Sequence, residues 1–278
     1  MDIHRFAIDT VTLAGPLEDK LAATRDAGFG GIEIWAKDLV SHPGGVNGAV
    51  AAIRESGLRV TSFQLLRDYE GLEAHLHTYK IDIAKSMLDL MDAIGAPMLV
   101  VASSTSPYAS GDMDRIVADL RALATLVTPR GVRVAFGAPA WARWINEYPA
   151  VWEAVRRADC PNLGVLINTF HLLARGTPLA ALDTIPGDRI FLVQLADYLG
   201  ELRDITETAD HRRSFPNESA HRETIAEIIR KIHRAGYGGD YVFEVFNDEY
   251  LHLAPASILA RARKAAEWLA AEASRASQ

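Results

Sequence analysis

Two hydrophobic patterns alternate along the chain. Seven stretches place apolar residues at three- and four-residue spacing, the period of an amphipathic helix. Between them lie short runs of mostly consecutive apolar residues, which are typical of parallel strands buried on both faces. The predicted helices are 17–27, 46–56, 75–94, 112–127, 148–158, 221–235 and 255–271, and the predicted strands are 6–8, 31–34, 60–63, 98–101, 132–136, 163–167, 190–193 and 241–243.

Glycine and proline residues separate most helices from the strand that follows. Gly57, Gly95-Ala96-Pro97 and Pro129-Arg130-Gly131 are examples of such helix-to-strand turns. Eight strands follow this arrangement, with a weak sixth helix expected near 179–182. The sequence therefore predicts an α/β fold, a single closed (β/α)8 TIM barrel over residues 1–278, rather than an open doubly wound sheet. No glycine-rich phosphate-binding sequence follows the first strand, which argues against dinucleotide binding.

Net charge, cysteine content and the length of the apolar runs limit the kinds of partner and the location that we expect for this protein. The formal net charge is -7 and no basic stripe is present, so we expect neither nucleic acid nor membrane as a partner, but a small-molecule substrate. Cys160 is the only cysteine, which fits a reducing compartment. No apolar run reaches the roughly 18 residues of a membrane helix, and the amino terminus has no leader-like pattern. We expect a cytoplasmic protein, and the sequence leaves a homo-oligomer open.

Polar residues directly follow the predicted strands. In a (β/α)8 barrel the carboxyl ends of the strands form the active site, so these side chains are the candidates for chemistry. They are rich in hydrogen-bonding groups and poor in groups that neutralise a divalent cation. The set is Asp9, Glu33, Gln64, Arg67, Ser103, Gly137, Asn168, His171, Gln194, Asp197, Glu244 and Asn247, with His211 and Arg213 in the loop after the seventh strand.

Several segments resemble those of a known family and occur in the same order along the chain. Asn168-Thr169-Phe170-His171 and Phe243-Glu244-Val245-Phe246-Asn247 lie at strand ends, and similar matches occur at 63–71, 140–146, 193–197 and 211–216. Together they resemble the xylose isomerase-like TIM barrels of the sugar phosphate isomerase/epimerase superfamily, above all the bacterial 3-dehydroshikimate dehydratase branch. The resemblance runs from about residue 10 to residue 247. We expect no fused dioxygenase-like domain, which some members of that branch carry.

The resemblance implies a divalent metal held after strands five, six, seven and eight by a glutamate, an aspartate, a glutamine and a glutamate. Here those positions are Gly137, Asn168, Gln194 and Glu244, so two of three anionic ligands are missing. Mg2+ and Mn2+ depend on carboxylate oxygens. We therefore expect no cofactor, or at most weakly bound Mn2+ or Mg2+, with Gln194 and Glu244 as remnant ligands. A displaced metal site built with Glu33, Asp197 or His211 is the alternative.

The resemblance also implies proton abstraction beside a carbonyl. Without a metal, Asn168, Gln194 and an arginine are candidates for a hydrogen-bonded oxyanion site. His171 or Glu244 is the candidate base, with His211 as a further catalytic residue. The remaining candidates for substrate binding are Gln64, Arg67 and Arg213, whose guanidinium groups suit a carboxylate.

Each candidate also has a structural interpretation. The arginines could form surface ion pairs, the histidines could be satisfied in the core, and Trp141, Trp144 and Phe170 are expected to be packing residues. Gly137 is expected to open space for a larger ligand.

Three functions stay open at this point. The first is a diverged enzyme for dehydration, isomerisation or cyclisation of a small oxygenated ring or sugar-like acid, a lyase or isomerase. The second is a metal-dependent 3-dehydroshikimate dehydratase that forms protocatechuate. The third is a non-catalytic barrel that binds a small molecule, because fold alone does not decide function.

Overall fold

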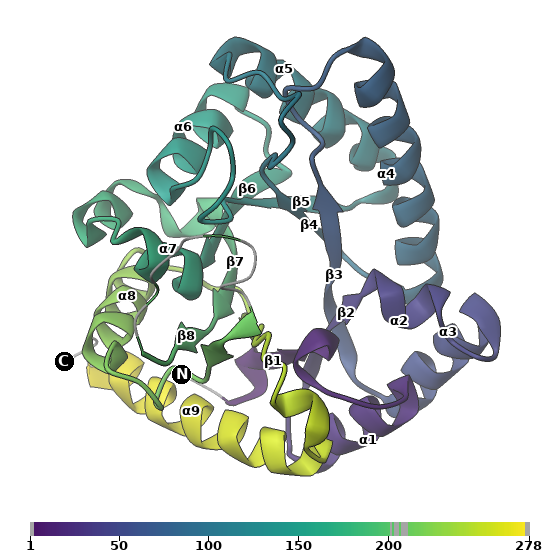
Figure 1. Cartoon of the computed structure of the whole chain (residues 1–278), viewed down its shortest axis with the longest axis vertical. Coiled ribbons are helices and arrows are strands. Elements are labelled where there is room, and N and C mark those ends of the chain that lie inside the picture. The colour runs from purple at the N-terminus through teal and green to yellow at the C-terminus, as the bar shows by residue number, and fades with distance from the viewer. Residues whose placement is uncertain (1–2, 201, 203–205, 207–210, 276–278) are drawn as a thin grey trace.

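Eight parallel strands close into a barrel that helices surround (Figure 1). The computed structural model describes residues 3–200, 202, 206 and 211–275. The strand order is β1-β10-β7-β6-β5-β4-β3-β2, and parallel pairing of β1 with β10 closes the ring. The predicted TIM barrel is therefore confirmed. Its strands are β1 (Phe6–Asp9), β2 (Gly31–Trp35), β3 (Arg59–Arg67), β4 (Met98–Ala102), β5 (Arg133–Gly137), β6 (Leu163–Asn168), β7 (Ile190–Leu195) and β10 (Tyr241–Phe243).

The helices follow the predicted amphipathic stretches. In α8 the positions Ile225, Ile228, Ile229 and Ile232 are buried, at the three- and four-residue spacing that turns one face toward the barrel. The predicted weak sixth helix is a 3₁₀ helix, Leu179–Thr184. The sequence did not predict α2 or α7. The helices are α1 (Leu17–Asp26), α2 (Ala36–Val40), α3 (Gly45–Ser56), α4 (Ala74–Ile94), α5 (Met113–Val127), α6 (Tyr148–Ala158), α7 (Thr169–Arg175), α8 (Arg222–Arg234) and α9 (Pro255–Arg275).

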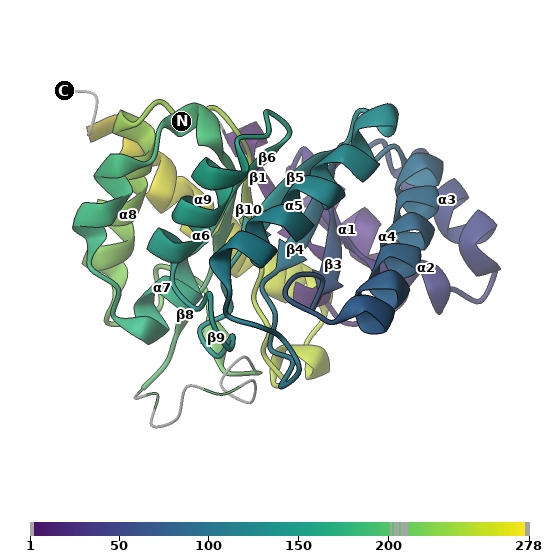
Figure 2. The ribbon, with the colours of Figure 1, turned by 90° about the horizontal axis from the view of Figure 1, so that it is seen from above.

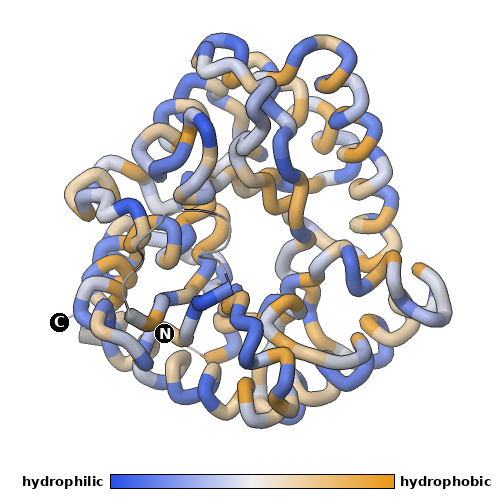
Figure 3. The backbone as a smooth tube through the Cα atoms, viewed as in Figure 1, coloured by the Kyte–Doolittle hydropathy of each residue, from blue (hydrophilic) through white to orange (hydrophobic). Residues whose placement is uncertain are grey.

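Two groups of buried apolar residues make up the core. The larger one joins the strands to the surrounding helices, along which hydrophobic and hydrophilic positions alternate (Figure 3). The smaller one comes from the strands alone and includes Val100, Leu166 and Val242, with Leu65 packed against it. Val100, Leu166 and Leu65 also line the pocket described below, so this second group forms part of the pocket wall.

A small antiparallel sheet lies at one end of the barrel. It pairs β8 (Asp197–Tyr198) with β9 (Arg213–Ser214), and Figure 2 shows it at the end opposite the two chain termini. This is the end where the barrel strands finish, because β8 follows β7 after one residue. None of the helices in the described ranges is long and apolar enough to cross a membrane.

Candidate active site

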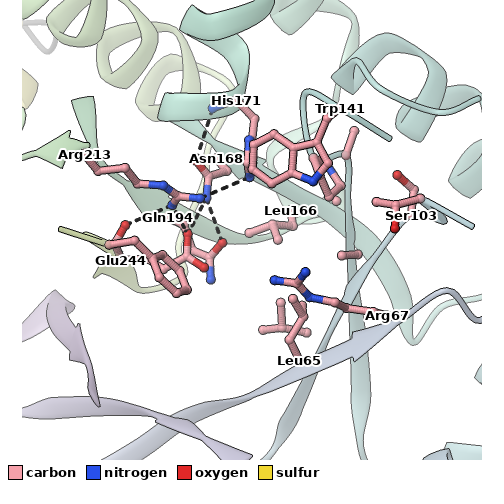
Figure 4. A pocket seen from close by; sticks show the side chains of 17 residues that line it. Leu65, Arg67, Ser103, Trp141, Leu166, Asn168, His171, Gln194, Arg213 and Glu244 are labelled. Atoms are coloured by element: carbon pink, nitrogen blue, oxygen red, sulfur yellow. Dashed lines mark hydrogen bonds and ion pairs between the residues drawn. The ribbon is translucent and has the colours of Figure 1, made fainter. Parts of the chain in front are cut away.

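A pocket of about 530 Å³ opens at the carboxyl ends of the strands (Figure 4). Part of its wall is hydrocarbon, from side chains such as Leu65, Val100 and Leu166. The ionisable and amide side chains converge from separate elements, as expected for a barrel active site. They are Arg67 at the end of β3, Asn168 at the end of β6, His171 in α7, Gln194 in β7, Arg213 in β9 and Glu244 just after β10.

Asn168 is held in one orientation by the start of α7. Its Oδ1 accepts hydrogen bonds from the amides of Phe170 at 3.1 Å and His171 at 3.4 Å, as a helix N-cap does. Its Nδ2 donates to Gln194 Oε1 at 3.0 Å and to Glu244 Oε2 at 2.7 Å. Two acceptors thus take the two amide hydrogens. Rotating the amide by half a turn would disrupt all four contacts.

Arg213 and Glu244 form a buried ion pair. The guanidinium Nη1 lies 2.5 Å from Glu244 Oε2 and also donates to the Glu244 carbonyl at 3.1 Å. The Arg213 side chain is only 1% exposed and stacks against the rings of Phe170 and Phe246, at 4.4 and 5.0 Å from their centroids. Asn247 holds the Arg213 backbone through a bond of 2.7 Å from its Nδ2. The positive charge beside the Glu244 carboxylate is therefore supplied by a side chain, the Arg213 guanidinium.

The buried carboxyl groups of Asp9 and Glu33 form a pair, and Glu33 is hydrogen-bonded to the pocket residue Gln194. Gln194 Nε2 donates to Glu33 Oε1 at 2.8 Å, and Ser62 donates to the other Glu33 oxygen. The carboxyl group of Asp9 is hydrogen-bonded to that of Glu33. Burial, followed by the charges of Glu33 and Glu244, raises the pKa of Asp9 well above its usual value, and burial raises the pKa of Glu33 to about 7. Glu33 thereby fixes Gln194 with its Oε1 toward Asn168.

His171 is uncharged in its resting environment. Its Nδ1 accepts a hydrogen bond from the Ala140 amide at 3.3 Å, and its Nε2 lies 3.4 Å from Arg213 Nη2. Burial lowers the pKa of His171 well below its usual value, and the positive charges of Arg213 and Arg67 lower it further. In Figure 4 the guanidinium of Arg67 points into the pocket from the wall that faces His171.

The structure places some predicted site residues away from the pocket wall. The Gln64 side chain is buried and its Nε2 donates to Asp9. The side chain of His211 is 52% exposed, and its Nδ1 pairs with Asp248 at 2.8 Å. His211 lines a separate surface hollow, together with Leu199 and Asp248. Strand-end position alone does not distinguish these residues from those that face the pocket.

The displaced metal site that was kept as the alternative is not assembled in the part of the chain that the structure describes. Asp197 lies between its own partners, with Oδ1 bonded to His221 Nδ1 at 2.8 Å and Oδ2 accepting from Ser219. Glu33 bonds Gln194 and Ser62 instead. Across the ranges that the structure describes, no group of three or more His, Cys, Asp and Glu residues is arranged to hold a metal ion.

The space beside Gly137 differs from expectation. A Cβ at position 137 would lie 2.7 Å from Leu166 Cδ2, so the volume that a side chain would take is already filled. The expectation that Gly137 opens room for a larger ligand is therefore wrong on this side. Trp141, expected to be a packing residue, does line the pocket. Leu166 was not recognised as a pocket residue from the sequence, because only the closure of the barrel decides that its side chain points inward.

Comparison with known proteins agrees with this architecture. A family model described as a xylose isomerase-like TIM barrel matches residues 21–272. The chain belongs to this family. Among curated members, the 3-dehydroshikimate dehydratase of Pseudomonas putida is 38% identical over 245 residues, which cover 88% of this chain and 38% of the relative. The enzyme of the same name from Pseudomonas aeruginosa is 34% identical over 244 residues, covering 88% and 38%.

Solved structures with this fold superpose closely. A fusion protein of a xylose isomerase-like TIM barrel and a 4-hydroxyphenylpyruvate dioxygenase has a TM-score of 0.92 and 34% identity, covering 98% of this chain and 44% of its own. A protein with a bound zinc atom has a TM-score of 0.84 at 18% identity, covering 96% and 98%, and shares the fold. The chain spans less than half the length of the two Pseudomonas relatives and of the fusion protein.

The side chains at the positions where the resemblance implies a metal do not fit a hard divalent cation. Gly137 offers no ligand atom, and Asn168 directs N–H groups inward where the resemblance implies a carboxylate. Gln194 Oε1 and Glu244 Oε2, two of the oxygens at these positions, accept those N–H groups. Divalent cations need several oxygen ligands and carboxylate charge. This donor set supplies hydrogen-bond donors at the place where a cation would need acceptors.

Proposed function

We propose that this protein is an enzyme that removes a proton next to a carbonyl group on a small oxygenated ring or sugar-like acid, without a divalent metal. Dehydration of the 3-dehydroshikimate type is the reaction that the Pseudomonas relatives favour. The observation that carries the proposal is the hydrogen-bonded cluster of Asn168, Gln194, Arg213 and Glu244, in which Asn168 Nδ2 and Arg213 Nη1 both contact Glu244 Oε2.

Glu244 is the proposed base. It is 5% exposed, lines the pocket and directly follows β10. The end of this strand therefore holds the Glu244 carboxylate in a fixed position in the pocket. Its carboxylate takes the proton from the carbon beside the carbonyl, and the electron pair of the broken C–H bond moves toward the carbonyl oxygen to give an enolate. In a dehydration, the enolate then expels a neighbouring hydroxyl group. The proton on Glu244 accompanies that group as water.

The other pocket residues have positioning and charge roles. Arg67 enters from the end of β3 and is the candidate partner for a substrate carboxylate. Arg213 supplies a fixed positive charge in the pocket, in place of the metal that the sequence resemblance implies. Asn168 fixes the positions of the Glu244 and Gln194 side chains relative to each other, because its two amide hydrogens are donated to these two side chains.

Exchange of substrate protons for deuterium tests the proposal. The full chain, freed of metals with a chelator, is incubated in D2O with 3-dehydroshikimate and with a panel of cyclic keto acids, and proton NMR follows the carbon beside the carbonyl. We expect exchange or dehydration in the presence of chelator. Glu244→Gln should slow it by about 100-fold or more, the usual scale for loss of a general base. Lysine 85 lies on the exposed surface of α4, and Lys85→Gln is the control variant.

Two outcomes would overturn the proposal. Turnover that depends on added Mn2+ would favour the metal-dependent 3-dehydroshikimate dehydratase that the sequence resemblance implies. Tight binding of a ring acid that stays unchanged and unexchanged over days would favour a non-catalytic binding barrel. Protocatechuate absorption after addition of 3-dehydroshikimate, with and without Mn2+, distinguishes the first of these within one assay.

A further inference from the structure

The pocket wall changes from polar to apolar and back along the order of the barrel strands. Arg67 ends β3, whereas Gln194 lies in β7 and Glu244 directly follows β10. Strands β4, β5 and β6 lie between β3 and β7 in the closed barrel. Apart from Asn168, the pocket residues on these three strands have no polar side-chain atom, and they form an apolar wall of Val100, Ala102, Gly137 and Leu166.

Leu166 makes this wall apolar beside the position where the resemblance implies a glutamate. A Cβ at position 137 would lie 2.7 Å from Leu166 Cδ2, so Leu166 takes the side-chain space of residue 137. The Leu166 side chain lines the pocket and is 6% exposed. It also belongs to the strand-only group of core residues, together with Val100 and with Leu65 packed against that group. The apolar wall is therefore continuous with the core of the barrel.

The polar groups next to the apolar wall already have partners within the protein. Both amide hydrogens of Asn168 are donated to side chains, and its Oδ1 accepts two backbone N–H groups. The Gly137 carbonyl accepts from the Ser103 amide at 2.9 Å, and the Ser103 hydroxyl donates to the Ile145 carbonyl at 2.5 Å. A ligand hydroxyl placed against this wall would lose its hydration without gaining a hydrogen-bond donor, which disfavours binding. A hydrocarbon edge at the same place would gain from leaving water.

We infer that Leu166 is a specificity-determining residue that selects rings with an unsubstituted hydrocarbon edge between two polar ends. This inference rests on the proposed function for the class of ligand, a small oxygenated ring. Figure 4 shows Arg67 and Glu244 on opposite sides of the pocket, with Leu166 between them. A carboxylate at one end of the ring suits Arg67, and an oxygen at the other end meets the polar cluster around Glu244. The substrate is therefore a carbocyclic acid, and not a sugar or cyclitol with a hydroxyl on almost every carbon.

Two benzoic acids that differ by one hydroxyl group test this inference without turnover. The compound 3,4-dihydroxybenzoate leaves one ring edge unsubstituted, whereas 3,4,5-trihydroxybenzoate has a hydroxyl on both edges. Calorimetric titration of the full chain should show the first acid binding about 10- to 100-fold more tightly, since an apolar pocket rejects an added hydroxyl by up to about 100-fold. The sugar acid D-galacturonate should bind more weakly than 3,4-dihydroxybenzoate, because its hydroxyl groups would face the apolar wall.

Two variants give the added hydroxyl a partner at the wall. Leu166→Asn introduces an amide and should lower the preference about 10-fold, the scale of one hydrogen bond of about 1.4 kcal/mol. Ala102→Ser, at the position paired with Gly137 between β4 and β5, adds little volume and should lower the preference in the same direction. Ala96→Ser is the matched control and should keep the wild-type preference. Ala96 and Ala102 are similarly buried, at 5% and 7% exposure, but Ala96 precedes β4 at the opposite end of the strand.

Several outcomes would overturn the inference: equal binding of the two benzoates, tighter binding of the trihydroxy acid or of D-galacturonate, or binding of none of them at millimolar concentration. A preference that neither Leu166→Asn nor Ala102→Ser changes would also overturn it. Selective binding without proton exchange on any ring acid would overturn the proposed enzyme and leave the selectivity of the wall standing. Turnover that depends on Glu244, combined with no preference between the benzoates, would overturn this inference alone.

Discussion

Leu166 fills the side-chain space of Gly137. A Cβ built at position 137 would lie 2.7 Å from Leu166 Cδ2, 3.0 Å from Cγ and 3.1 Å from Cβ. Family resemblance places a glutamate at position 137, so in this chain a hydrocarbon side chain takes the space of a charged one. The resemblance also implies an aspartate at position 168, where this chain has Asn168. Both differences remove negative charge from one side of the pocket.

Gly137→Ala is expected to destabilise the protein by about 1–3 kcal/mol, because the added methyl group overpacks a filled core. Gly238→Ala is the matched control, since a Cβ at position 238 meets nothing within 4 Å. Urea unfolding measures both. In the Gly137→Ala/Leu166→Ala double variant, the cost should be less than the sum of the single costs. Equal stability of the Gly137 and Gly238 variants would contradict the packing found at Leu166.

The Arg213 and Glu244 side chains should be energetically coupled. Either Arg213→Met or Glu244→Gln leaves an unpartnered group in a buried environment, and each is expected to cost about 3–5 kcal/mol. The double variant should cost clearly less than the sum, because it removes both members of the pair. Additive costs in a double-mutant cycle would show that the pair does not act as a unit. The surface pair Arg156 and Glu153 provides a control cycle with weak coupling.

Asn168→Asp should convert a metal-indifferent protein into one that responds to cations. The variant replaces N–H donors with a carboxylate beside Glu244 Oε2 and Gln194 Oε1, so it should be destabilised in the absence of metal. Mn2+ should then raise its melting temperature while leaving wild type unchanged. Asn162→Asp, at a site where the amide contacts Ala124, is the control. A Mn2+ response in wild type, or none in Asn168→Asp, counts against the proposed role of Asn168.

The raised pKa of Glu70 makes the free energy of unfolding depend on pH, and this effect is independent of the pocket. Its side chain is buried and accepts from the Ser104 amide at 2.6 Å. Burial, with the charges of Asp68 and Asp119 adding, raises its pKa from 4.5 to about 7. Between these values the folded protein holds a proton that the unfolded chain has released, so this contribution to stability is lost as pH rises through 7.

The size of this loss is on the order of 3 kcal/mol between about pH 5 and pH 8. Glu70→Gln removes the titrating group and keeps an oxygen for the Ser104 amide. Urea unfolding of both proteins across this range should therefore give a smaller decline with rising pH for the variant. Parallel curves for wild type and Glu70→Gln would contradict the raised pKa of Glu70. The comparison isolates Glu70 from Glu33, whose raised pKa acts in the same direction.

The sequence predicted the barrel because buried parallel strands leave a strong local signal. Continuous apolar runs and the glycines that end helices are set by neighbouring residues, as at Gly95, which closes α4 with a φ of 69°. The short helix α7 was missed because its length of 7 residues gives too little periodicity. Its start could have been recognised from Asn168, which we interpreted as a lost metal ligand and as a candidate for the oxyanion site but not as a helix N-cap.

The site was only partly predictable, since barrel closure decides which strand-end side chains meet. Arg67, His171 and Glu244 reach the pocket, whereas Gln64 turns to Asp9 and His211 faces the surface. Sequence spacing does not contain this information. The hydrogen-bond direction of Asn168 likewise depends on α7 and on the position of Gln194 across the β6 and β7 pair.

Calorimetric titration of the chelator-treated wild-type chain with Mn2+ tests the central claim most directly. We expect no binding at micromolar concentration, because N–H groups of Asn168 and Arg213 engage Gln194 Oε1 and Glu244 Oε2 and few carboxylate oxygens face the pocket. One equivalent of Mn2+ bound at micromolar affinity or better, and lost in Glu244→Gln, would contradict it.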